Sequence, residues 1–217
     1  MADTVKSRRY HSPRRAEQAA ATRRAVLAAA RELVVTKGYA ATTVAEIARR
    51  AGVAVDTVYA TIGRKPALLR ELVETAISGT DEAVPAERRD YVRRTREAGT
   101  AREKFAAYAE GMVEVLPRLA PIFLALRDAA VTDAGCAALW AEIARRRADN
   151  MRLFAADLRA TGELRADLTD DEVADIIWSM NAPEYYTLLV HDRGWTPRRY
   201  ADWLVDAWSR VLLEPGQ

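Results

Sequence analysis

The sequence predicts an all-α protein, and three observations support this fold class. Apolar residues recur at i, i+3 and i+4 through most of the 217 residues, which places them on one face of a helix. The strict alternation that is typical of β-strands is nearly absent. Glycine, proline and threonine–glutamate pairs three residues apart mark the places where one helix ends and the next begins.

A short stretch near the N-terminus contains the most informative pattern in the chain. Thr43 and Glu46 can form a capping box that opens a helix, and Gly52 is placed to end it. A second short helix is predicted at about 55–62, and the Lys65-Pro66 pair starts a third. This order is typical of a helix-turn-helix, in which the second helix enters the DNA major groove. The alternative is an ordinary pair of core helices joined by a short loop.

The same stretch resembles the DNA-binding signature of the tetracycline-repressor (TetR) family. The preceding helix, within RRAVLAAARELVVTKGYAATTV, has the family's apolar spacing and its Gly38-Tyr39 corner. The resemblance covers roughly the first 80 residues, and beyond them only length and helical pattern agree. The matching positions are Thr43, Ile47, Ala48, Ala51, Gly52, Val53, Thr57, Tyr59, Lys65, Leu68 and Leu69.

The resemblance implies a set of DNA contacts. Lys65 is expected to neutralise a phosphate, as the matching lysine does in the family. The chain departs from the family pattern at Ala54, Val55, Asp56, Ala60 and Ile62, so fewer polar groups are left to read base edges; apolar contacts to thymine methyls would replace them. The predicted DNA-binding residues are Thr42, Thr43, Ala54, Val55, Thr57, Tyr59, Ala60, Lys65, Arg14 and Arg15.

The charge distribution favours DNA binding over a plain helical core. Residues 1–70 carry 14 lysines and arginines against 5 acidic residues, whereas residues 71–217 carry 19 against 26. Only one end of the molecule is therefore expected to meet phosphate. Residues 1–15 are predicted to be a disordered basic arm that reaches the backbone or the minor groove; the alternative is a solubilising tail.

Composition argues against other classes of protein. The N-terminus is charged and polar, which does not resemble a signal peptide, and no apolar run is long enough to span a membrane. With one cysteine and two histidines, the usual catalytic pairs cannot be assembled. The sequence therefore predicts no enzyme activity, no metal site, no cofactor and a cytoplasmic location.

The second part of the chain is predicted to consist of helices at about 65–80, 86–98, 101–116, 134–161, 170–191 and 197–213. Pro117 and Pro121 are expected to restart the chain into a separate helix that ends near Val131, and Pro183 should kink the helix in which it lies.

The last two helices are more apolar than packing on one side of a monomer requires, and the family resemblance implies a dimer through them. The alternative is that these stripes close the domain's own core. The predicted interface residues are Ile176, Met180, Leu188, Tyr200, Trp203, Leu204, Trp208 and Val211.

The interior between the helices is the expected place for a small ligand, although for each residue an ordinary core role is the alternative. Arg127 is a candidate polar anchor for such a ligand; the alternative is that the Arg127-Asp128 pair lies on the solvent face. The predicted lining residues are Met112, Leu116, Phe123, Arg127, Trp140, Met151, Phe154, Trp178, Asn181 and Tyr185.

These inferences divide the chain into an arm (1–15), a helix-turn-helix domain (16–64) and a ligand-binding and dimerisation domain (65–217). The expected function is a homodimeric transcriptional regulator, a repressor, that binds a pseudo-palindromic DNA operator and is released by a small molecule. Two alternatives stay open: a DNA-binding dimer without ligand control, and an α-helical enzyme.

Overall fold

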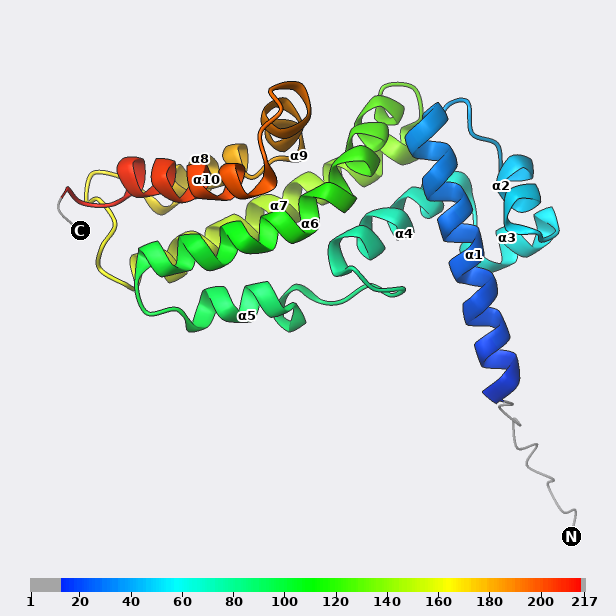
Figure 1. Cartoon of the computed structure of the whole chain (residues 1–217), viewed down its shortest axis with the longest axis horizontal. Coiled ribbons are helices and arrows are strands. Elements are labelled where there is room, and N and C mark those ends of the chain that lie inside the picture. Colours follow the sequence, from blue (N-terminus) through cyan, green and yellow to red (C-terminus); the bar gives the residue numbers. More distant parts are fainter. Residues whose placement is uncertain (1–12, 216–217) are drawn as a thin grey trace, which may run out of the picture.

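The computed structural model describes residues 13–215, and these fold into helices and loops without a β-strand, which confirms the all-α class. Figure 1 shows the order of the helices along the chain. Within the described residues no helix combines the length and the apolar character needed to cross a bilayer. The helices are α1 (Pro13–Lys37), α2 (Val44–Ala51), α3 (Val55–Ile62), α4 (Lys65–Ser78), α5 (Asp90–Glu97), α6 (Ala101–Ala130), α7 (Ala134–Arg159), α8 (Asp170–Met180), α9 (Pro183–Tyr186) and α10 (Pro197–Leu212), with short 3₁₀ and π turns at Ala86–Arg88 and Thr187–Asp192.

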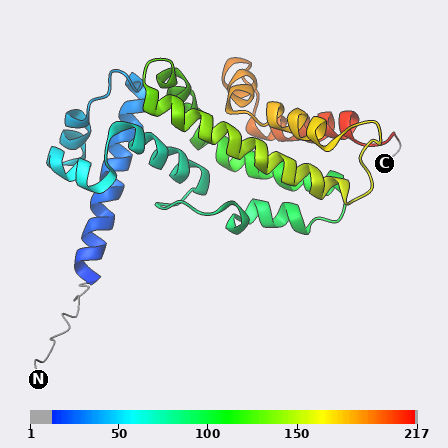
Figure 2. The same ribbon diagram turned by 180° about the vertical axis from the view of Figure 1, so that it is seen from behind.

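The long helices α6 and α7 form the spine of the molecule. Helix α10 packs on α6 and α8 packs on α7, whereas α4 and α5 pack on α6. Seen from both sides, α8 and α10 lie along one flank of the spine and α5 along the other (Figures 1 and 2). Helices α1 to α3 form a head at one end, so α3 lies far from the C-terminal end of the chain.

Three helix starts confirm the capping boxes that the sequence predicts. Thr43, Thr100 and Thr169 each accept a hydrogen bond from the backbone N–H three residues on, and the glutamate there accepts one from the threonine N–H. These hydrogen bonds lower the pKa of Glu103 and Glu172, because they favour the charged carboxylate.

The structure corrects the prediction of a helix break at the prolines of the spine, because α6 runs without interruption from Ala101 to Ala130. A proline inside a helix removes one hydrogen bond and crowds the preceding turn. Pro117 is exposed and Pro121 is partly exposed, so water can reach the freed carbonyls. Their neighbours Leu116, Leu119 and Ala120 are buried in the core, and this packing holds the helix together.

The predicted helix at 170–191 is also corrected, since it is broken and not kinked. Helix α8 ends at Met180 and a new helix begins at Pro183. Ala182 has an extended conformation, φ −66° and ψ 141°, because the residue before a proline avoids the helical region. The break leaves Asn181 as the buried C-terminal cap of α8.

The predicted basic arm is only partly within the described residues. Arg14 and Arg15 are exposed in the first turn of α1, so this part of the arm is helical and the prediction of disorder is wrong for it. Residues 1–12 of the arm lie outside the described range.

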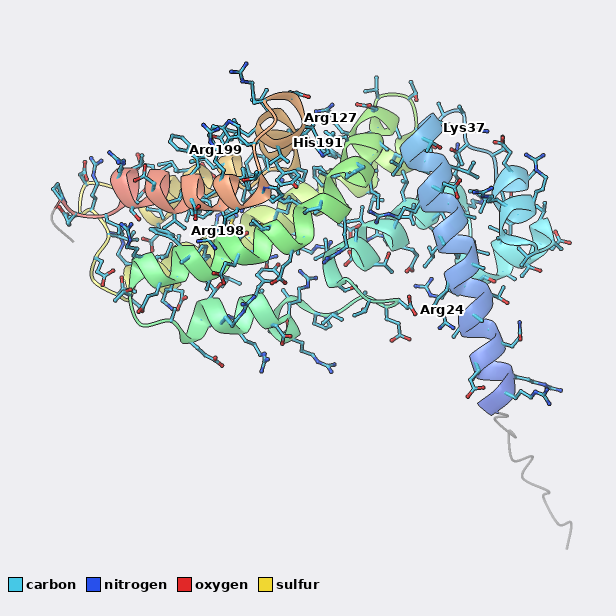
Figure 3. The ribbon with its side chains drawn as sticks, viewed as in Figure 1. Arg24, Lys37, Arg127, His191, Arg198 and Arg199 are labelled. Atoms are coloured by element: carbon cyan, nitrogen blue, oxygen red, sulfur yellow. The ribbon has the colours of Figure 1, made fainter. Side chains whose placement is uncertain are left out.

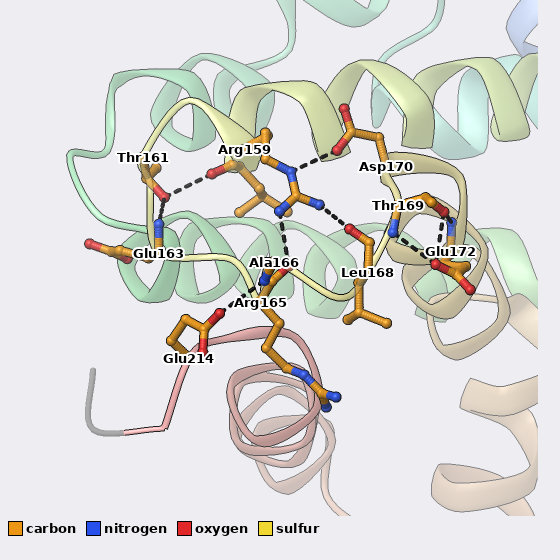
Figure 4. A network of polar contacts seen from close by, with 11 residues as sticks. Arg159, Thr161, Glu163, Arg165, Ala166, Leu168, Thr169, Asp170, Glu172 and Glu214 are labelled. Carbon is orange, nitrogen blue, oxygen red and sulfur yellow. Dashed lines mark hydrogen bonds and ion pairs between the residues drawn. The ribbon is translucent and has the colours of Figure 1, made fainter.

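The connection between α7 and α8 is fixed by one arginine (Figure 4). The Arg159 guanidinium donates to the carbonyls of Arg165, at 3.0 Å, and Leu168, at 2.5 Å, and it pairs with Asp170 at the start of α8. Glu214, beyond α10, accepts from the N–H of Ala166. The Glu214 contact attaches the C-terminal end of the described chain to this connection.

Buried apolar side chains form two cores. The first joins α1 to α4 with the C-terminal part of α6 and the N-terminal part of α7. The second joins the rest of α6 and α7 with α8 and α10. Because α4 belongs to the first core together with both the head and the spine, the head is packed directly against the body.

Candidate DNA interface and internal cavity

The helix-turn-helix is built as the sequence predicts. Gly52 ends α2 with φ 69°, a left-handed conformation that a residue with a side chain rarely adopts. Ile47 of α2 and Val58 of α3 are buried and pack the two helices against the head core. The opposite face of α3 is therefore free to meet a ligand outside the protein.

The exposed face of α3 and its N-cap contain four of the ten residues predicted to contact DNA. Val55 is 39% exposed and Tyr59 is 48% exposed, and Ala54, Asp56 and Ala60 are exposed beside them. Asp56, Tyr59 and Ala60 are at i, i+3 and i+4, so they share one side of the helix. Thr57 is partly buried, and Thr43 is exposed at the start of α2.

The structure corrects the prediction for Thr42. Its side chain is buried, with only 1% exposed, and its hydroxyl donates to the carbonyl of Gly38 at 2.8 Å. A buried and satisfied hydroxyl cannot reach a phosphate. Thr42 instead closes the corner between α1 and α2.

Lys65 has partners inside the protein. Its ammonium donates to the carbonyl of Tyr39 at 2.5 Å and lies 3.9 Å from the centroid of the Tyr39 ring. Partial burial lowers the pKa of Lys65, because it disfavours the charged form. The ammonium has three donors, so a phosphate contact would have to share it with Tyr39.

Two arginines that the sequence reasoning missed border α3. Arg64 directly precedes α4, is exposed and forms no ion pair within residues 13–215. The Arg49 side chain at the end of α2 is 80% exposed. Its Nη2 atom lies 3.9 Å from the Glu46 carboxylate, which is a loose ion pair. By contrast, Arg50 and Lys37 are paired with Glu32 and Glu46; Figure 3 labels Lys37 at the end of α1. The sequence places Arg49 and Arg64 within a few residues of the predicted reading helix, and this nearness could have identified them as candidate phosphate contacts.

The head is joined to the spine at the Tyr39 corner. The Tyr39 hydroxyl donates to Asp133 at 2.9 Å, and Asp133 also accepts from the N–H of Cys136 at 3.0 Å as the N-cap of α7. These two hydrogen bonds lower the pKa of Asp133. A Cβ at Gly135 would lie 2.9 Å from Pro66, so the backbone of α7 approaches α4 closely here.

The body contains a cavity of about 540 Å³ between α4, α5, α6, α7 and the α8–α9 break. Its wall is mainly apolar, as is usual for small-molecule sites of this size. Six of the residues predicted to line a ligand site lie in this wall: Met112, Leu116, Phe123, Met151, Phe154 and Asn181.

The other four predicted ligand residues lie elsewhere. Trp140 packs its ring 4.6 Å from that of Phe123, and Tyr185 accepts a hydrogen bond from the indole of Trp203. The exposed Arg127 pairs with Asp128 and Glu184 on the surface beside α9 (Figure 3), so it is not the polar anchor. Trp178 stacks behind the wall on an arginine.

That arginine is Arg147, and the sequence reasoning missed it. It lines the cavity with its guanidinium 4.9 Å from the Trp178 ring centroid and 5.7 Å from that of Phe123. It donates to the carbonyl of Trp178 and to the side-chain oxygen of Asn181. In the sequence Arg147 is one of three consecutive arginines, and only the packing of α6, α7 and α8 decides that its guanidinium lies between Phe123 and Trp178.

The predicted dimer residues separate into two groups. Tyr200, Leu204 and Trp208 are fully buried in the second core of their own chain, so their prediction as interface residues is wrong and the core alternative holds. Leu188, Trp203 and Val211 are exposed, and Ile176 and Met180 are partly exposed.

Comparisons with known proteins agree with this geometry. Residues 26–72 match the family described as bacterial regulatory proteins, tetR family. No curated protein matches the sequence. Solved structures share the fold along nearly the whole chain. NalD, the secondary repressor of the MexAB-OprM multidrug efflux pump in Pseudomonas aeruginosa, is 19% identical with a TM-score of 0.71, and the match covers 92% of this chain and 100% of NalD.

Two further structures contain ligands. The SmeT–triclosan complex has a TM-score of 0.70 at 19% identity, covering 90% of this chain and 93% of SmeT. The regulator FadR from Bacillus subtilis in complex with stearoyl-CoA has a TM-score of 0.69 at 21% identity, covering 85% of this chain and 96% of FadR. Residues 26–72 are therefore similar to the bacterial regulatory proteins of the tetR family, and the chain shares its fold with solved regulators such as NalD.

Proposed function

We propose that the protein is a ligand-responsive repressor that binds a pseudo-palindromic operator as a homodimer. The observation that carries this proposal is the double role of α4. Leu68, Leu69 and Leu72 pack into the head core, and Val73 and Ile77 of the same helix line the cavity. A ligand that moves the cavity wall therefore acts on the element that directly follows the reading helix.

In this proposal residues 16–64 read DNA, and residues 65–217 bind the ligand and the second subunit. Val55, Tyr59 and Ala60 face the major groove, where apolar side chains contact thymine methyls. Arg64 and Arg49 contact phosphates, and Lys65 supports the Tyr39 corner. The exposed residues Trp203 and Val211 of α10 and the partly exposed residues Ile176 and Met180 of α8 form the surface between two subunits, in a four-helix arrangement.

The test begins with selection of bound fragments from the genome of the source organism. We expect a pseudo-palindrome whose half-sites are about one helical turn apart. Tyr59→Ala should lower the affinity for the operator. Arg64→Ala should weaken binding to all DNA sequences alike and should reduce the slope of log affinity against log salt concentration by about one unit. If the wild-type protein selects no DNA above its non-specific background at moderate salt, the proposal fails.

The second candidate function is a DNA-binding dimer without ligand control. The cavity favours ligand control, as does the presence of triclosan and stearoyl-CoA in the related structures. Operator and ligand should weaken each other's binding by the same factor, because coupling is reciprocal. A ligand that binds equally well with and without operator would favour the second candidate.

A further inference from the structure

Among the charged residues of the cavity wall, Arg147 is distinguished by having no ionic partner among the described residues and a place between two aromatic rings. Most of the wall is aliphatic or aromatic, with Ile77, Leu116, Leu119, Ile143 and Phe154 among the residues that build it. Within residues 13–215 Arg147 forms no ion pair, although it is partly buried and burial lowers its pKa. A guanidinium in such a site is costly unless something compensates its charge.

The arrangement around Arg147 holds the guanidinium in place and leaves part of it available. The rings of Phe123 and Trp178 lie near it, and both hydrogen bonds to the protein leave from one nitrogen, Nη2, toward the Trp178 carbonyl at 3.2 Å and Asn181 at 2.8 Å. Nε and Nη1 have no hydrogen-bond partner within the described residues. A guanidinium presents its donors in a planar fork that matches a carboxylate or phosphate.

The other charged groups of the wall do not neutralise Arg147. Asp157 pairs with Lys104 at 2.9 Å and Glu74 pairs with Arg146 at 2.6 Å. Glu87, Arg89 and Arg96 are on the α5 side; Glu87 and Arg96 are exposed, and Arg89 donates to the carbonyl of Val84. Glu184 is near enough to interact with Arg147 through space but lies in the ion pair with Arg127.

We infer that the ligand of this cavity is an organic anion, a carboxylic or phosphoric acid with an apolar body, whose anionic group binds Arg147. The apolar body would lie against the aliphatic and aromatic wall, and Asn181 would keep the guanidinium oriented. The ligand would supply a negative charge at hydrogen-bonding distance from Arg147, which no residue within 13–215 does. This inference rests on the proposed function for its regulatory meaning, but the binding itself can be tested without DNA.

The test uses pairs of probes that differ only in the head group: decanoate with decanol, and 2-naphthoate with 2-naphthamide. Binding to the full-length protein is measured by titration calorimetry and by tryptophan emission. We expect each carboxylate to bind about ten-fold or more tightly than its neutral partner, because a charge-assisted pair of hydrogen bonds is lost with the charge. Decyltrimethylammonium should bind least, because the guanidinium repels it.

Variants then assign the preference to one residue. Arg147→Met keeps much of the length of the side chain and should remove the preference for carboxylate over the neutral partner, and Arg147→Lys should retain part of it. Arg145→Met is the matched control, because Arg145 is exposed on the same helix and forms no ion pair within the described residues. If Arg147→Met does not fold, Arg147→Lys takes its place, and a carboxylate preference that this variant leaves unchanged overturns the assignment to Arg147.

The outcomes separate this inference from the proposed function. A carboxylate that binds no better than its neutral partner, absence of binding included, overturns the inference. A neutral compound that binds and releases operator leaves the proposed function standing while the inference fails. Conversely, an anion that requires Arg147 but does not release operator supports the inference and counts against regulation by this cavity.

Discussion

At the scale of single residues, the exposed face of α3 has a carboxylate, and the helix contains no lysine or arginine. Asp56 is exposed in the first turn of α3, on the same side as Tyr59 and Ala60. A carboxylate repels phosphate, but in the major groove it can accept a hydrogen bond from the cytosine amino group. We therefore expect Asp56 to help distinguish one base pair from another and not to raise the affinity for DNA in general.

Asp56→Ala should raise affinity for non-specific DNA and lower the preference for the operator, by roughly 1–3 kcal/mol of discrimination at one base pair. Binding to operator and to variants at each position, at fixed salt, measures the effect. Glu97→Ala makes the same change in charge on an exposed residue of α5 and should change neither quantity. Loss of affinity for all sequences with unchanged discrimination would contradict this role.

Asp133 links the head to the spine, and its contribution to stability depends on pH. Hydrogen bonds from the Cys136 N–H and the Tyr39 hydroxyl lower its pKa in the folded protein. A carboxyl whose pKa is lowered by folding stabilises the protein above its unfolded pKa of about 3.9 and loses this effect as the pH falls through the folded pKa.

Asp133→Asn should therefore reduce the free energy of unfolding at neutral pH, because a neutral amide oxygen accepts these two hydrogen bonds less strongly than a carboxylate does, and the difference from wild type should shrink as the pH falls below about 4. Urea unfolding at a series of pH values measures this. Tyr39→Phe removes one donor while keeping the ring under Lys65, and its effect should be smaller. A difference that is constant with pH would show that the charge of Asp133 plays no part.

At the scale of elements, the contact between α5 and α6 depends on a glycine. A Cβ at Gly111 would lie 2.5–2.6 Å from the Cβ and Cγ of Tyr91, and both belong to the base of that side chain. Rotation of the tyrosine cannot relieve this contact, so α5 itself would have to move. Tyr91 lines the cavity, and the glycine therefore sets the width of the cavity on this side.

Gly111→Ala should destabilise the protein by roughly 1–2 kcal/mol, because overpacking outweighs the gain in helix propensity. Thermal unfolding measures it, with Gly99→Ala as the control, since the nearest atom to a Cβ there is 3.6 Å away. In a Tyr91→Ala background the penalty should disappear. A penalty that persists there would place its cause outside the α5 contact.

At the scale of the whole molecule, the two tryptophans of α10 have different roles although they lie on one helix. Trp208 is fully buried in the second core and Trp203 is 39% exposed, with its ring 6.3 Å from that of Trp195. Tryptophan side chains that are exposed on one subunit, as Trp203 is, are frequent anchors in protein interfaces.

Trp203→Glu should give a folded monomer with little change in melting temperature and a large loss of binding to the full operator, but not to a half-site. Trp208→Glu should prevent folding, because it buries an unpaired charge. Sedimentation velocity and circular dichroism distinguish these results. A Trp203→Glu protein that remains dimeric would place the interface away from this part of α10.

The sequence by itself determined the features that depend on local chemistry. The three capping boxes, Gly52 at the turn and the bounds of α2 and α3 follow from side chains that hydrogen-bond to their own backbone or adopt unusual φ values. Periodicity likewise predicted α4, α7 and α10, and the apolar interior in which Met112, Leu116 and Phe154 line the cavity.

Only the tertiary structure decided what depends on neighbours distant in the chain. Helix α6 continues past two prolines because its neighbours pack against it. On α10, Tyr200, Leu204 and Trp208 are buried in the second core, whereas Trp203 is exposed. Of the three consecutive arginines 145–147, one is exposed and one is held between Phe123 and Trp178 in the cavity. An apolar stripe on a helix has the same residue types and spacing whether it faces the core or a second subunit. Only the side chains that pack against the stripe distinguish the two cases, and these come from distant parts of the sequence.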